Sequence, residues 1–516
     1  MRYSSQDEPQ ARSEPVFYRK ESAPRARAKR RATFTFNAAS KAHDGLAPGF
    51  RDYFGQKTVE KLNIRRGTRG KSLTMSGRQI DTVIVGGGQA GLAMSYHLKQ
   101  EVREHVVLER APKAANAWRN ERWDSFTLVT PNFQVRMPGA EYDGNDPYGF
   151  MSLAEVVKYF DDYVKRFDLP VHCGVEVYSV EKTRAGYLVR TREGNYYAEN
   201  VVIATGLYQS PKIPKFSEAI PAGILQIHSM KYRNPSSLPA GAILVVGTGQ
   251  SGAQIAQELY QSGRKVYLSI GSAGRVPRRY RGRDINDWFT RLGLFDTEVK
   301  ELKSPRDKFA SHPQISGKNG GQSLNLHQFA RDGVVLVGRV REVRDGKLMI
   351  AADLIETLSK VDRFEVDALR RIDDYIARTG LKAPVESVLQ LHDGYEQVQI
   401  SELDLKASGI STVIWATGYS FDFGLVKLPV LDRDGYPIQK RGVTAYEGMY
   451  FLGMPWLHKR KSGILFGVGE DAAYLVERIA AREAVLYSST SASRTFSTKQ
   501  EVTLRQTMTP ASLKLK

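Results

Sequence analysis

Short apolar runs that lead into glycines and then into a helical repeat occur twice along this chain. Residues 80–85 form a β-branched run that predicts a buried parallel strand, and residues 92–99 follow it with the apolar spacing of a helix. The succession returns with a strand expected over 243–246, a helix from 253 to 259 and a strand over 265–270. Strands and helices that alternate in this way favour an α/β fold.

Three further segments extend the pattern. Residues 201–214 and 412–423 each begin as an apolar strand that ends in Ala-Thr-Gly. Residues 367–381 are expected to form an amphipathic helix, for which core packing is the leading interpretation and a lid or subunit contact the second. The apolar side of that helix would carry Leu369, Ile372, Tyr375 and Ile376.

The glycines after the first strand have the spacing G-x-G-x-x-G. Gly86 permits a tight turn, Gly88 lets the backbone approach a pyrophosphate, and Gly91 lets the helix pack on the strand. The phosphates would then lie at the helix N-terminus, beside Gln89 and Ala90. The alternative is a glycine turn that binds no ligand.

An acidic residue follows the first turn at the distance expected of a ribose ligand. Glu109 lies 18 residues past Gly91, at the end of the next strand, where its carboxylate can accept bonds from ribose hydroxyls. With its neighbour Arg110, it is assigned to a site for an unphosphorylated ribose, as in FAD or NAD.

The second turn repeats the glycines as Gly247, Gly249 and Gly252, with Gln250 and Ser251 at the start of its helix. The offset of 18 residues now gives an apolar residue, Ile270.

Beyond Ile270 comes an arginine-rich segment that includes Arg275, Arg278 and Arg279. An acid would repel a 2′-phosphate, whereas arginines would bind it, so this site is predicted to take NADPH. A solvated basic loop is the alternative. Two different nucleotide sites in one chain are explained if one holds a flavin and the other delivers hydride to it.

Composition and charge restrict the other classes of function. The 516 residues are 41% hydrophobic and 25% charged, with no run of 18 apolar residues and no secretory signal, so a cytoplasmic enzyme without a transmembrane segment is expected. The single cysteine, Cys173, excludes an internal disulfide, a CxxC dithiol and a cysteine-type metal site, and the nine histidines show no ligand spacing. No metal is expected.

The net charge of +19 is concentrated at the N-terminus. Residues 1–74 hold 17 Lys or Arg against 7 Asp or Glu, a net charge of +10, and show no sustained periodicity. A disordered basic arm with no specific nucleic acid partner is the leading interpretation. A tail that contacts RNA or membrane, or an organelle transit peptide, is the alternative.

Taken together, these motifs resemble the flavin-containing monooxygenases and their bacterial CzcO-like relatives over about residues 78–485. The resemblance rests on the order of the glycine turns, the two Ala-Thr-Gly strands and the segments "AWRNERWDSFTLVTPN", "HSMKYRNP" and "SGILFGVGEDA". It implies an α/β fold of two dinucleotide-binding, Rossmann-like domains. The FAD domain, 76–235 and 405–485, would be interrupted by an NADPH domain with a helical insertion, 236–404. Residues 1–75 and 486–516 would be an extension and a tail.

By position, the resemblance also implies roles for single residues. Trp118 would lie near the FAD ribose strand, Asn132 beside the flavin ring as the catalytic residue, and Asp471 where a helix N-terminus points at the flavin. From the residues alone, Asn132 is a turn residue beside a proline and Asp471 an N-cap. The ends of the two Ala-Thr-Gly strands would contact FAD through Thr205 and Gly206, and NADPH through Thr417 and Gly418.

Two motifs depart from the family pattern. The linker fingerprint F-x-G-x-x-x-H-x-x-x-[YFW] reads "PAGILQIHSMKY" here, with Pro221 in place of the aromatic residue and an extra residue before His228, which fits a CzcO-like relative better than a true flavin-containing or Baeyer–Villiger monooxygenase. N-hydroxylating relatives carry D-x-x-x-[LF]-A-T-G-Y, where this chain has Ser411 and Trp415.

The resemblance implies an NADPH- and FAD-dependent monooxygenase. It would use O₂ to form a C4a-hydroperoxyflavin and would transfer one oxygen to a small nitrogen, sulfur or carbonyl substrate. An NADPH-dependent flavin oxidase or reductase without oxygen transfer is one alternative, and a non-enzymatic nucleotide-sensing or transport-linked module is another. The substrate and the oligomeric state, a homodimer included, are left open.

Overall fold

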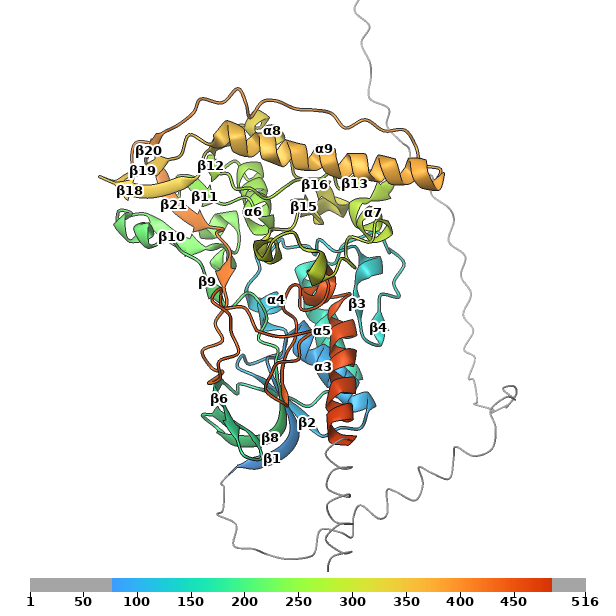
Figure 1. Cartoon of the computed structure of the whole chain (residues 1–516). Coiled ribbons are helices and arrows are strands. Elements are labelled where there is room, and N and C mark those ends of the chain that lie inside the picture. The colour runs from blue at the N-terminus through green and yellow to red at the C-terminus, as the bar shows by residue number, and fades with distance from the viewer. Residues whose placement is uncertain (1–76, 485–516) are drawn as a thin grey trace, which may run out of the picture. The chain divides into compact units, whose positions relative to one another are not determined.

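Two mainly parallel sheets organise the protein, and each contains one of the glycine turns (Figure 1). The structure is a computed structural model that describes residues 77–484. The extension expected at 1–75 and the tail expected at 486–516 lie outside the described residues. None of the helices within 77–484 is both long and apolar enough to cross a membrane.

The first sheet has seven strands in the order β5-β2-β1-β8-β7-β6, and β23 pairs with β8. β1, β2, β5, β8 and β23 run parallel, whereas β6 and β7 form an antiparallel extension. Because β23 comes late in the chain, the sheet is assembled from two separated segments, as expected of a discontinuous domain. Its strands are β1 (Arg78–Val85), β2 (His105–Glu109), β5 (Val171–Cys173), β6 (Val177–Thr183), β7 (Gly186–Thr191), β8 (Gly194–Ile203) and β23 (Met449–Phe451).

The second sheet has five parallel strands in the order β10-β21-β11-β12-β17. They are β10 (Leu225–His228), β11 (Ala242–Val246), β12 (Val266–Ser269), β17 (Val335–Val337) and β21 (Ile410–Trp415). This sheet therefore extends beyond the expected range of 236–404 at both ends. The reason is that β21, the second Ala-Thr-Gly strand, inserts between β10 and β11.

Together the two sheets confirm the predicted α/β fold with two Rossmann-like domains. In the second sheet, β11 is wholly buried and β21 is buried at all but one residue, as expected for a parallel sheet covered on both faces. A third sheet of β18 (Val340–Arg344), β19 (Lys347–Ile350) and β20 (Glu402–Asp404) packs against one side of the second sheet.

Helices follow the strands and cover the sheets. The longest, α9, belongs to the insertion and lies beside the second sheet (Figure 1), where Ile372 is fully buried against Val276 and Trp288. This burial agrees with the leading interpretation of that segment as core. The helices are α3 (Gln89–Gln100), α4 (Asn116–Asn120), α5 (Leu153–Arg166), α6 (Gln250–Gln261), α7 (Ile285–Arg291), α8 (Leu326–Arg331), α9 (Leu354–Thr379) and a last one over 468–484.

Short antiparallel pairs occupy the connections between these elements. The pair of β9 (Ser210–Pro211) with β22 (Tyr419–Ser420) joins the chain that leaves the first Ala-Thr-Gly strand to the chain that leaves the second. The others are β3 (Arg136–Met137) with β4 (Ala140–Glu141), β13 (Arg279–Tyr280) with β14 (Arg283–Asp284), and β15 (Ile315–Ser316) with β16 (Gln322–Ser323).

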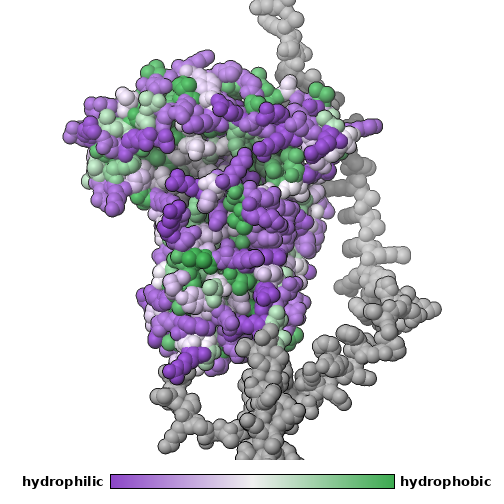
Figure 2. Space-filling model, viewed as in Figure 1, coloured by the Kyte–Doolittle hydropathy of each residue, from purple (hydrophilic) through white to green (hydrophobic). Residues whose placement is uncertain are grey.

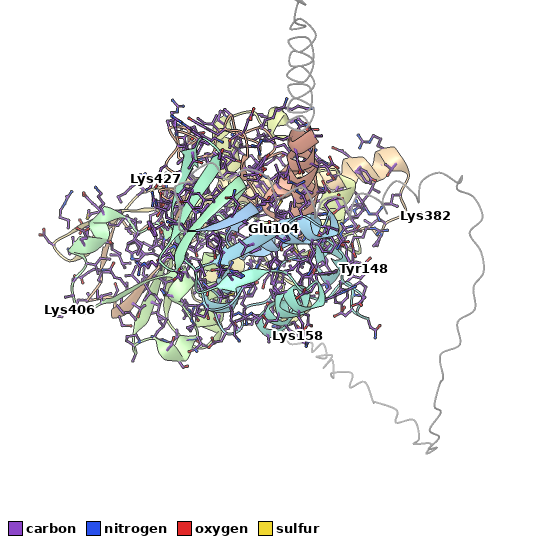
Figure 3. The ribbon with its side chains drawn as sticks, turned by 90° about the horizontal axis from the view of Figure 1, so that it is seen from below. Glu104, Tyr148, Lys158, Lys382, Lys406 and Lys427 are labelled. Atoms are coloured by element: carbon purple, nitrogen blue, oxygen red, sulfur yellow. The ribbon has the colours of Figure 1, made fainter. Side chains whose placement is uncertain are left out.

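The surface is mainly polar. The face shown in Figure 2 is largely hydrophilic, with hydrophobic residues in scattered small areas. Lys158, Lys382, Lys406 and Lys427 are exposed, and they project outward in Figure 3. This is the arrangement of an ordinary solvated surface.

Candidate functional site

The first glycine turn connects β1 to α3, and two of its glycines are required by close backbone contacts. Gly86 has φ +109, and a Cβ added there would lie 2.5 Å from the Ala204 carbonyl oxygen of the first Ala-Thr-Gly strand. A Cβ on Gly91 would lie 1.9 Å from the Gly86 oxygen. The turn therefore packs tightly against its own sheet, as a dinucleotide-binding turn does.

The remaining glycine of the motif, Gly88, is not packed against other atoms but faces open space. A Cβ built on it meets no heavy atom within 4 Å, and Gly88 caps α3 without any side-chain hydrogen bond. The first amides of α3, from Gln89 to Gly91, consequently have no side-chain cap, at the positive end of the helix dipole. Open space in front of such amides fits an anionic pyrophosphate, which supports the sequence prediction for this turn.

Glu109 ends β2 beside this turn. Its side chain is only 8% exposed, and its carboxylate accepts hydrogen bonds from the backbone N–H of Gly87 at 2.7 Å and of Ala111 at 2.8 Å. The acid is thus held against the glycine turn, where a ribose would lie. The adjacent Arg110 is exposed.

The second turn connects β11 to α6 and repeats this geometry closely. Gly247 has φ +103 and would place a Cβ 2.6 Å from the Ala416 oxygen, and a Cβ on Gly252 would lie 1.9 Å from the Gly247 oxygen. Gly249 again caps its helix without a side-chain bond and has no heavy atom within 4 Å of its Cβ position. The amides of Gln250 and Ser251 follow it, so the second turn fits a pyrophosphate equally well.

The two turns differ at the residue where the first has its acid. Ile270 is 1% exposed and presents no polar group. Here the hydroxyl of Thr248, within the turn, accepts a hydrogen bond from the N–H of Gly271 at 2.9 Å. Thr248 therefore links turn and strand in place of a carboxylate, and the ribose position carries no fixed negative charge. Sequence reasoning did not identify Thr248, because the middle residues of the glycine motif are variable.

The arginines that follow are not a free cationic cluster, nor are they all solvated. Arg275 and Arg278 are each 1% exposed. The Arg275 guanidinium lies 3.0 Å from Asp362 and 2.8 Å from Glu365, both on α9, and Arg278 donates to Asp284 at 2.8 Å.

Burial and pairing leave these two side chains poorly placed to reach a ligand, so their positions do not support the predicted 2′-phosphate contacts of Arg275 and Arg278. Arg279 is exposed, and its guanidinium donates to the carbonyl oxygens of Gly320 and Gly321. Of the three predicted side chains, Arg279 is the one that solvent reaches.

The two Ala-Thr-Gly ends occupy equivalent places in the two sheets. The N–H of Ala204 donates to Val85 at 2.8 Å, and that of Ala416 donates to Val246 at 2.9 Å. In each case the strand therefore ends beside a glycine turn. The glycines that follow, Gly206 and Gly418, have φ +78 and +81. The hydroxyl of Thr205 accepts a bond from Gln209, and that of Thr417 donates to the Lys212 oxygen.

Trp118 lies on α4, whose start bonds back to the first turn. The N–H of Ala115 donates to the Gly87 oxygen at 2.9 Å, and Ala115 has φ +57, the left-handed region that favours glycine. The alanine therefore keeps the turn at some cost in strain. Trp118 is half-buried and stacks on Phe160, with ring centroids 6.2 Å apart.

Asn132 begins the short 3₁₀ helix Asn132–Gln134. Its side-chain amide donates to the Asp146 oxygen at 2.9 Å, and its Oδ1 is buried with no hydrogen-bond partner among the described residues. Nearby, Gln134 donates to Thr290 at 2.9 Å, which joins this segment to α7 beyond the second sheet. A buried acceptor without a partner is suited to a bound group that donates a hydrogen bond.

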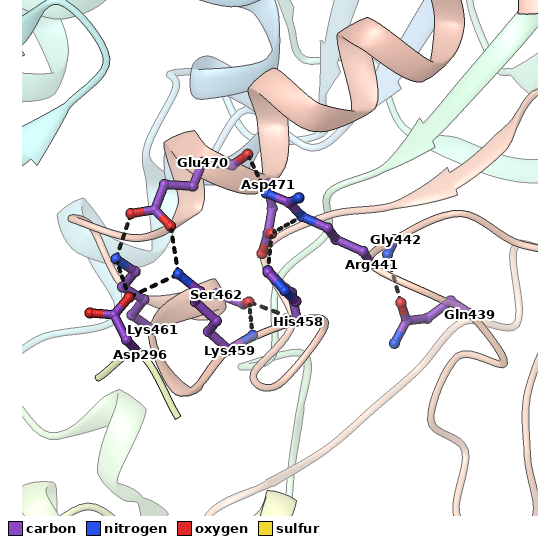
Figure 4. Close-up of polar contacts among 10 residues, drawn as sticks. All are labelled: Asp296, Gln439, Arg441, Gly442, His458, Lys459, Lys461, Ser462, Glu470 and Asp471. Carbon is purple, nitrogen blue, oxygen red and sulfur yellow. Dashed lines mark hydrogen bonds and ion pairs between the residues drawn. The ribbon is translucent and has the colours of Figure 1, made fainter. Parts of the chain in front are cut away.

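Asp471 lies in the first turn of the last helix, so the alternative that it is an N-cap is wrong (Figure 4). Its side chain is almost completely buried. Oδ1 accepts a hydrogen bond from Arg441 at 3.3 Å and is 3.8 Å from His458, whereas Oδ2 has no hydrogen-bond partner within residues 77–484. Like Asn132, it presents a buried acceptor.

A cluster of ion pairs surrounds this helix start. Lys459 and Lys461 both contact Asp296, at 2.9 Å and 2.8 Å, and Lys461 also contacts Glu470 at 2.5 Å (Figure 4). Asp296 follows α7, so the pairs join the late segment of the chain to the neighbourhood of the second sheet. Sequence reasoning missed these residues, because pairs between positions more than 160 residues apart leave no local signal.

The first turn also contacts this late segment directly. The side chain of Gln89 donates to the Gly463 oxygen at 2.8 Å, and a Cβ on Gly453 would lie 2.5 Å from that of Ala90. The glycine turn, the loop over 453–463 and the last helix therefore converge. Across the described range, no three His, Cys, Asp or Glu side chains gather in a way that would hold a metal ion.

Two Rossmann-like sheets, each with a glycine turn of the same geometry, define the class of two-dinucleotide flavoprotein oxidoreductases. Comparisons with known proteins agree with this class. Residues 83–283 match the family described as pyridine nucleotide-disulphide oxidoreductase. A CzcO-like oxidoreductase of Geobacillus kaustophilus, named as uncharacterized, is 36% identical over 402 residues, which cover 78% of this chain and 98% of that protein.

More distant proteins share the same architecture. A flavin-containing monooxygenase from Stenotrophomonas maltophilia shares the fold with a TM-score of 0.55 and 20% identity, over 78% of this chain and 99% of that one. A probable indole-3-pyruvate monooxygenase of Arabidopsis thaliana, YUCCA3, is 25% identical over 60% of this chain and 75% of its own length. This chain belongs to the CzcO-like oxidoreductases, within the superfamily of flavin monooxygenases and pyridine nucleotide-disulphide oxidoreductases.

Proposed function

We propose that the protein binds FAD at the first glycine turn and NADPH at the second, and that it is a monooxygenase for a small nucleophilic substrate. The observation that carries this proposal is the paired geometry of the turns. Both leave helix amides open in front of a glycine without side-chain neighbours, yet only the first has a buried acid, Glu109, at the ribose position. A flavin nucleotide suits the first turn, and a nucleotide with a 2′-phosphate suits the second.

The flavin supplies hydride acceptance and oxygen chemistry when bound, and the chain's own residues hold and orient it. Gly88 admits the pyrophosphate, Gln89 and Ala90 offer amides to it, and Glu109 accepts from the ribose. Asn132 and Asp471 contribute buried acceptors, at Oδ1 and Oδ2 respectively, that have no partner among the described residues. These acceptors would receive hydrogen bonds from the bound flavin or substrate.

At the second turn, Gly249 admits the pyrophosphate of the nicotinamide nucleotide, and Thr248 fixes the turn against Gly271. Ile270 leaves the ribose position free of negative charge, and Arg279 supplies the accessible cation for a 2′-phosphate. Arg275 and Arg278 support the loop from within by their buried ion pairs.

Membership of an oxidoreductase family leaves the non-enzymatic alternative without support. An oxidase or reductase that transfers no oxygen is the competing proposal. The single cysteine, Cys173, is exposed and has no second cysteine to form a disulfide with, so a reductase could not use an internal dithiol. An external acceptor would be required instead.

Product stoichiometry distinguishes the two proposals. Purified protein with bound flavin is supplied with NADPH, O₂ and panels of amines, thioethers and ketones, and both H₂O₂ and oxygenated product are measured. A monooxygenase should form one product per NADPH with its substrate and release little H₂O₂. Release of one H₂O₂ per NADPH with every compound tested would contradict oxygen transfer and favour an oxidase.

A further inference from the structure

Gln314 lies in a short segment that contacts the second glycine turn. It is completely buried, and its side-chain Nε2 donates to the carbonyl oxygen of Thr248 at 2.6 Å and to that of Ala273 at 3.3 Å. Thr248 is the second residue of the turn, and Ala273 belongs to the loop that follows β12. A single buried amide therefore connects the turn to the loop after the next strand.

The backbone on each side of Gln314 is held by α6, the helix that follows the second turn. The side chain of Gln250 donates to the Pro313 oxygen at 2.9 Å and accepts from the Ile315 N–H at 3.2 Å. Gln254, one helical turn further on, donates to the Ile315 oxygen at 2.9 Å. β15, which starts at Ile315, accordingly lies next to α6 (Figure 1). These bonds fix the segment from which Gln314 extends.

The same segment is also held from the side of the arginine-rich loop. The N–H of Gln314 donates to the Gly274 oxygen at 2.8 Å, and Gln314 forms a parallel bridge with Arg275. Arg275 is in turn paired with Asp362 and Glu365 of α9. The position of Gln314 is therefore set by α6 on one side and, through Arg275, by the helical insertion on the other.

The bond to Thr248 sets the direction of the next backbone amide. Thr248 and Gly249 are joined by a trans peptide bond, whose C=O and N–H point in opposite directions. Because Gln314 holds the oxygen, the N–H of Gly249 is directed away from Gln314. That N–H has no backbone partner among the described residues, and no heavy atom lies within 4 Å of a Cβ built on Gly249. The amide is thus available to a pyrophosphate.

The first turn holds its corresponding carbonyl in a different way. There the second residue is Gly87, whose oxygen accepts from the backbone N–H of Ala115 at 2.9 Å. The next glycines have closely similar conformations, with φ −82 and ψ −174 at Gly88 and φ −66 and ψ −176 at Gly249. Both turns therefore have a donor at this carbonyl, which is a backbone amide in the first turn and the side chain of Gln314 in the second.

We propose that Gln314 is a positioning residue of the second nucleotide site, which fixes the turn so that the Gly249 amide is directed at the pyrophosphate of a nicotinamide nucleotide. The role requires a donor, because Nε2 of Gln314 lies against two carbonyl oxygens that can only accept. The inference rests on the proposed nucleotide site. It does not depend on the preference for NADPH, because NADH carries the same pyrophosphate.

The test compares Gln314→Glu and Gln314→Met in the full-length protein with its bound flavin. Glutamate keeps the shape of glutamine but places an acceptor against both carbonyls, and methionine fills a similar volume without a donor. Gln257→Glu is the matched control. Gln257 is also a buried glutamine beside this segment, but its Nε2 contacts the side-chain oxygen of Gln322 at 3.4 Å instead of the turn. Gln322 can rotate its amide and donate to a glutamate.

Dissociation constants are measured for NADP⁺ and for adenosine 2′-phosphate, which carries the adenosine and the 2′-phosphate but no pyrophosphate. Both Gln314 variants should bind NADP⁺ about tenfold more weakly, because one charge-assisted hydrogen bond is misdirected, and adenosine 2′-phosphate within about twofold of the wild type. The KM for NADPH in flavin reduction should rise in parallel. Flavin content and the limiting rate of reduction should stay unchanged, and Gln257→Glu should match the wild type throughout.

Gln314 variants that bind NADP⁺ as tightly as the wild type would overturn the inference alone. An equal loss of affinity for adenosine 2′-phosphate, or an equal loss in Gln257→Glu, would also overturn it, because either would indicate a general disturbance of the domain. If Gln314→Glu fails to fold, Gln314→Met decides by the same comparison. A wild-type protein that binds neither NADP⁺ nor NAD⁺ would contradict the proposed function and the inference together, so the two failures are distinguishable.

Discussion

Replacement of Gly88 by valine is expected to abolish flavin binding and to leave the fold intact. Gly88 has φ −82 and ψ −174, which valine adopts without strain, and no heavy atom lies within 4 Å of the new Cβ. Loss of a glycine N-cap costs about 1 kcal/mol of stability. A pyrophosphate that loses two charge-assisted bonds loses about 3–6 kcal/mol, or roughly 10²- to 10⁴-fold in affinity.

The second turn provides the matched control. Gly249→Val makes the same change at φ −66 and ψ −176, again with no atom within 4 Å, so it should keep the flavin and lose NADPH-driven reduction. Gly91→Ala is the opposite control, because its Cβ would lie 1.9 Å from a backbone oxygen, which should destabilise the fold by about 3 kcal/mol. Flavin absorbance per protein and thermal unfolding are measured for all three. A yellow Gly88→Val protein, or a colourless Gly249→Val protein, would refute the assignment of the turns.

Other residues give independent predictions. Arg278→Met should lower the free energy of unfolding by about 3–5 kcal/mol in urea unfolding, because it leaves Asp284 buried and unpaired. Arg279→Ala should instead leave urea unfolding unchanged and lower the NADPH-to-NADH ratio of kcat/KM. A ratio that does not change in Arg279→Ala contradicts the phosphate role. Ala115→Gly should stabilise by about 0.5–1 kcal/mol in urea unfolding, since it relieves a positive φ; destabilisation contradicts this. Burial lowers the pKa of His105, so the unfolded chain binds a proton there at a higher pH than the folded protein does. The contribution of His105 to stability is therefore full above about pH 7 and declines as pH falls below about 6.5. A urea midpoint that is equal at pH 8 and 5.5, or a pH dependence of that midpoint that is unchanged in His105→Gln, contradicts this.

The helix α9 shows how far the apolar pattern reaches. Only its second half was expected, from 367, whereas the helix begins at Leu354. The first half buries Glu365 toward the protein, where a carboxylate pairs with Arg275, and a charged residue at a core position hides the apolar period. The helix ends at Thr379 rather than 381, because Gly380 adopts φ +66 and caps it.

The glycine turns were predictable because their function requires particular residues at fixed spacing. At Gly86, Gly91 and their counterparts, a Cβ would clash with nearby backbone atoms, so these positions require glycine and the motif can be recognised in the sequence. The burial of Arg275 was not predictable, because its partners on α9, Asp362 and Glu365, are about 90 residues away. Spacing identifies a cationic segment, but only the fold decides whether the cations face a ligand or a carboxylate.

The same limit applies to Gln314. In the sequence it follows a proline, and nothing local connects it with a glycine turn that lies 66 residues earlier. Only the fold, which brings its side-chain amide to the Thr248 oxygen, shows that it contacts the turn.

In the proposed function, a flavin at the first turn takes hydride from a nucleotide at the second. The most direct test of this transfer is an anaerobic absorbance scan of the purified protein before and after one equivalent of NADPH. We expect a flavin spectrum that bleaches with NADPH, that persists unbleached in Gly249→Val, and that is absent from Gly88→Val. A wild-type protein that folds without flavin, or whose flavin NADPH does not reduce, would contradict it.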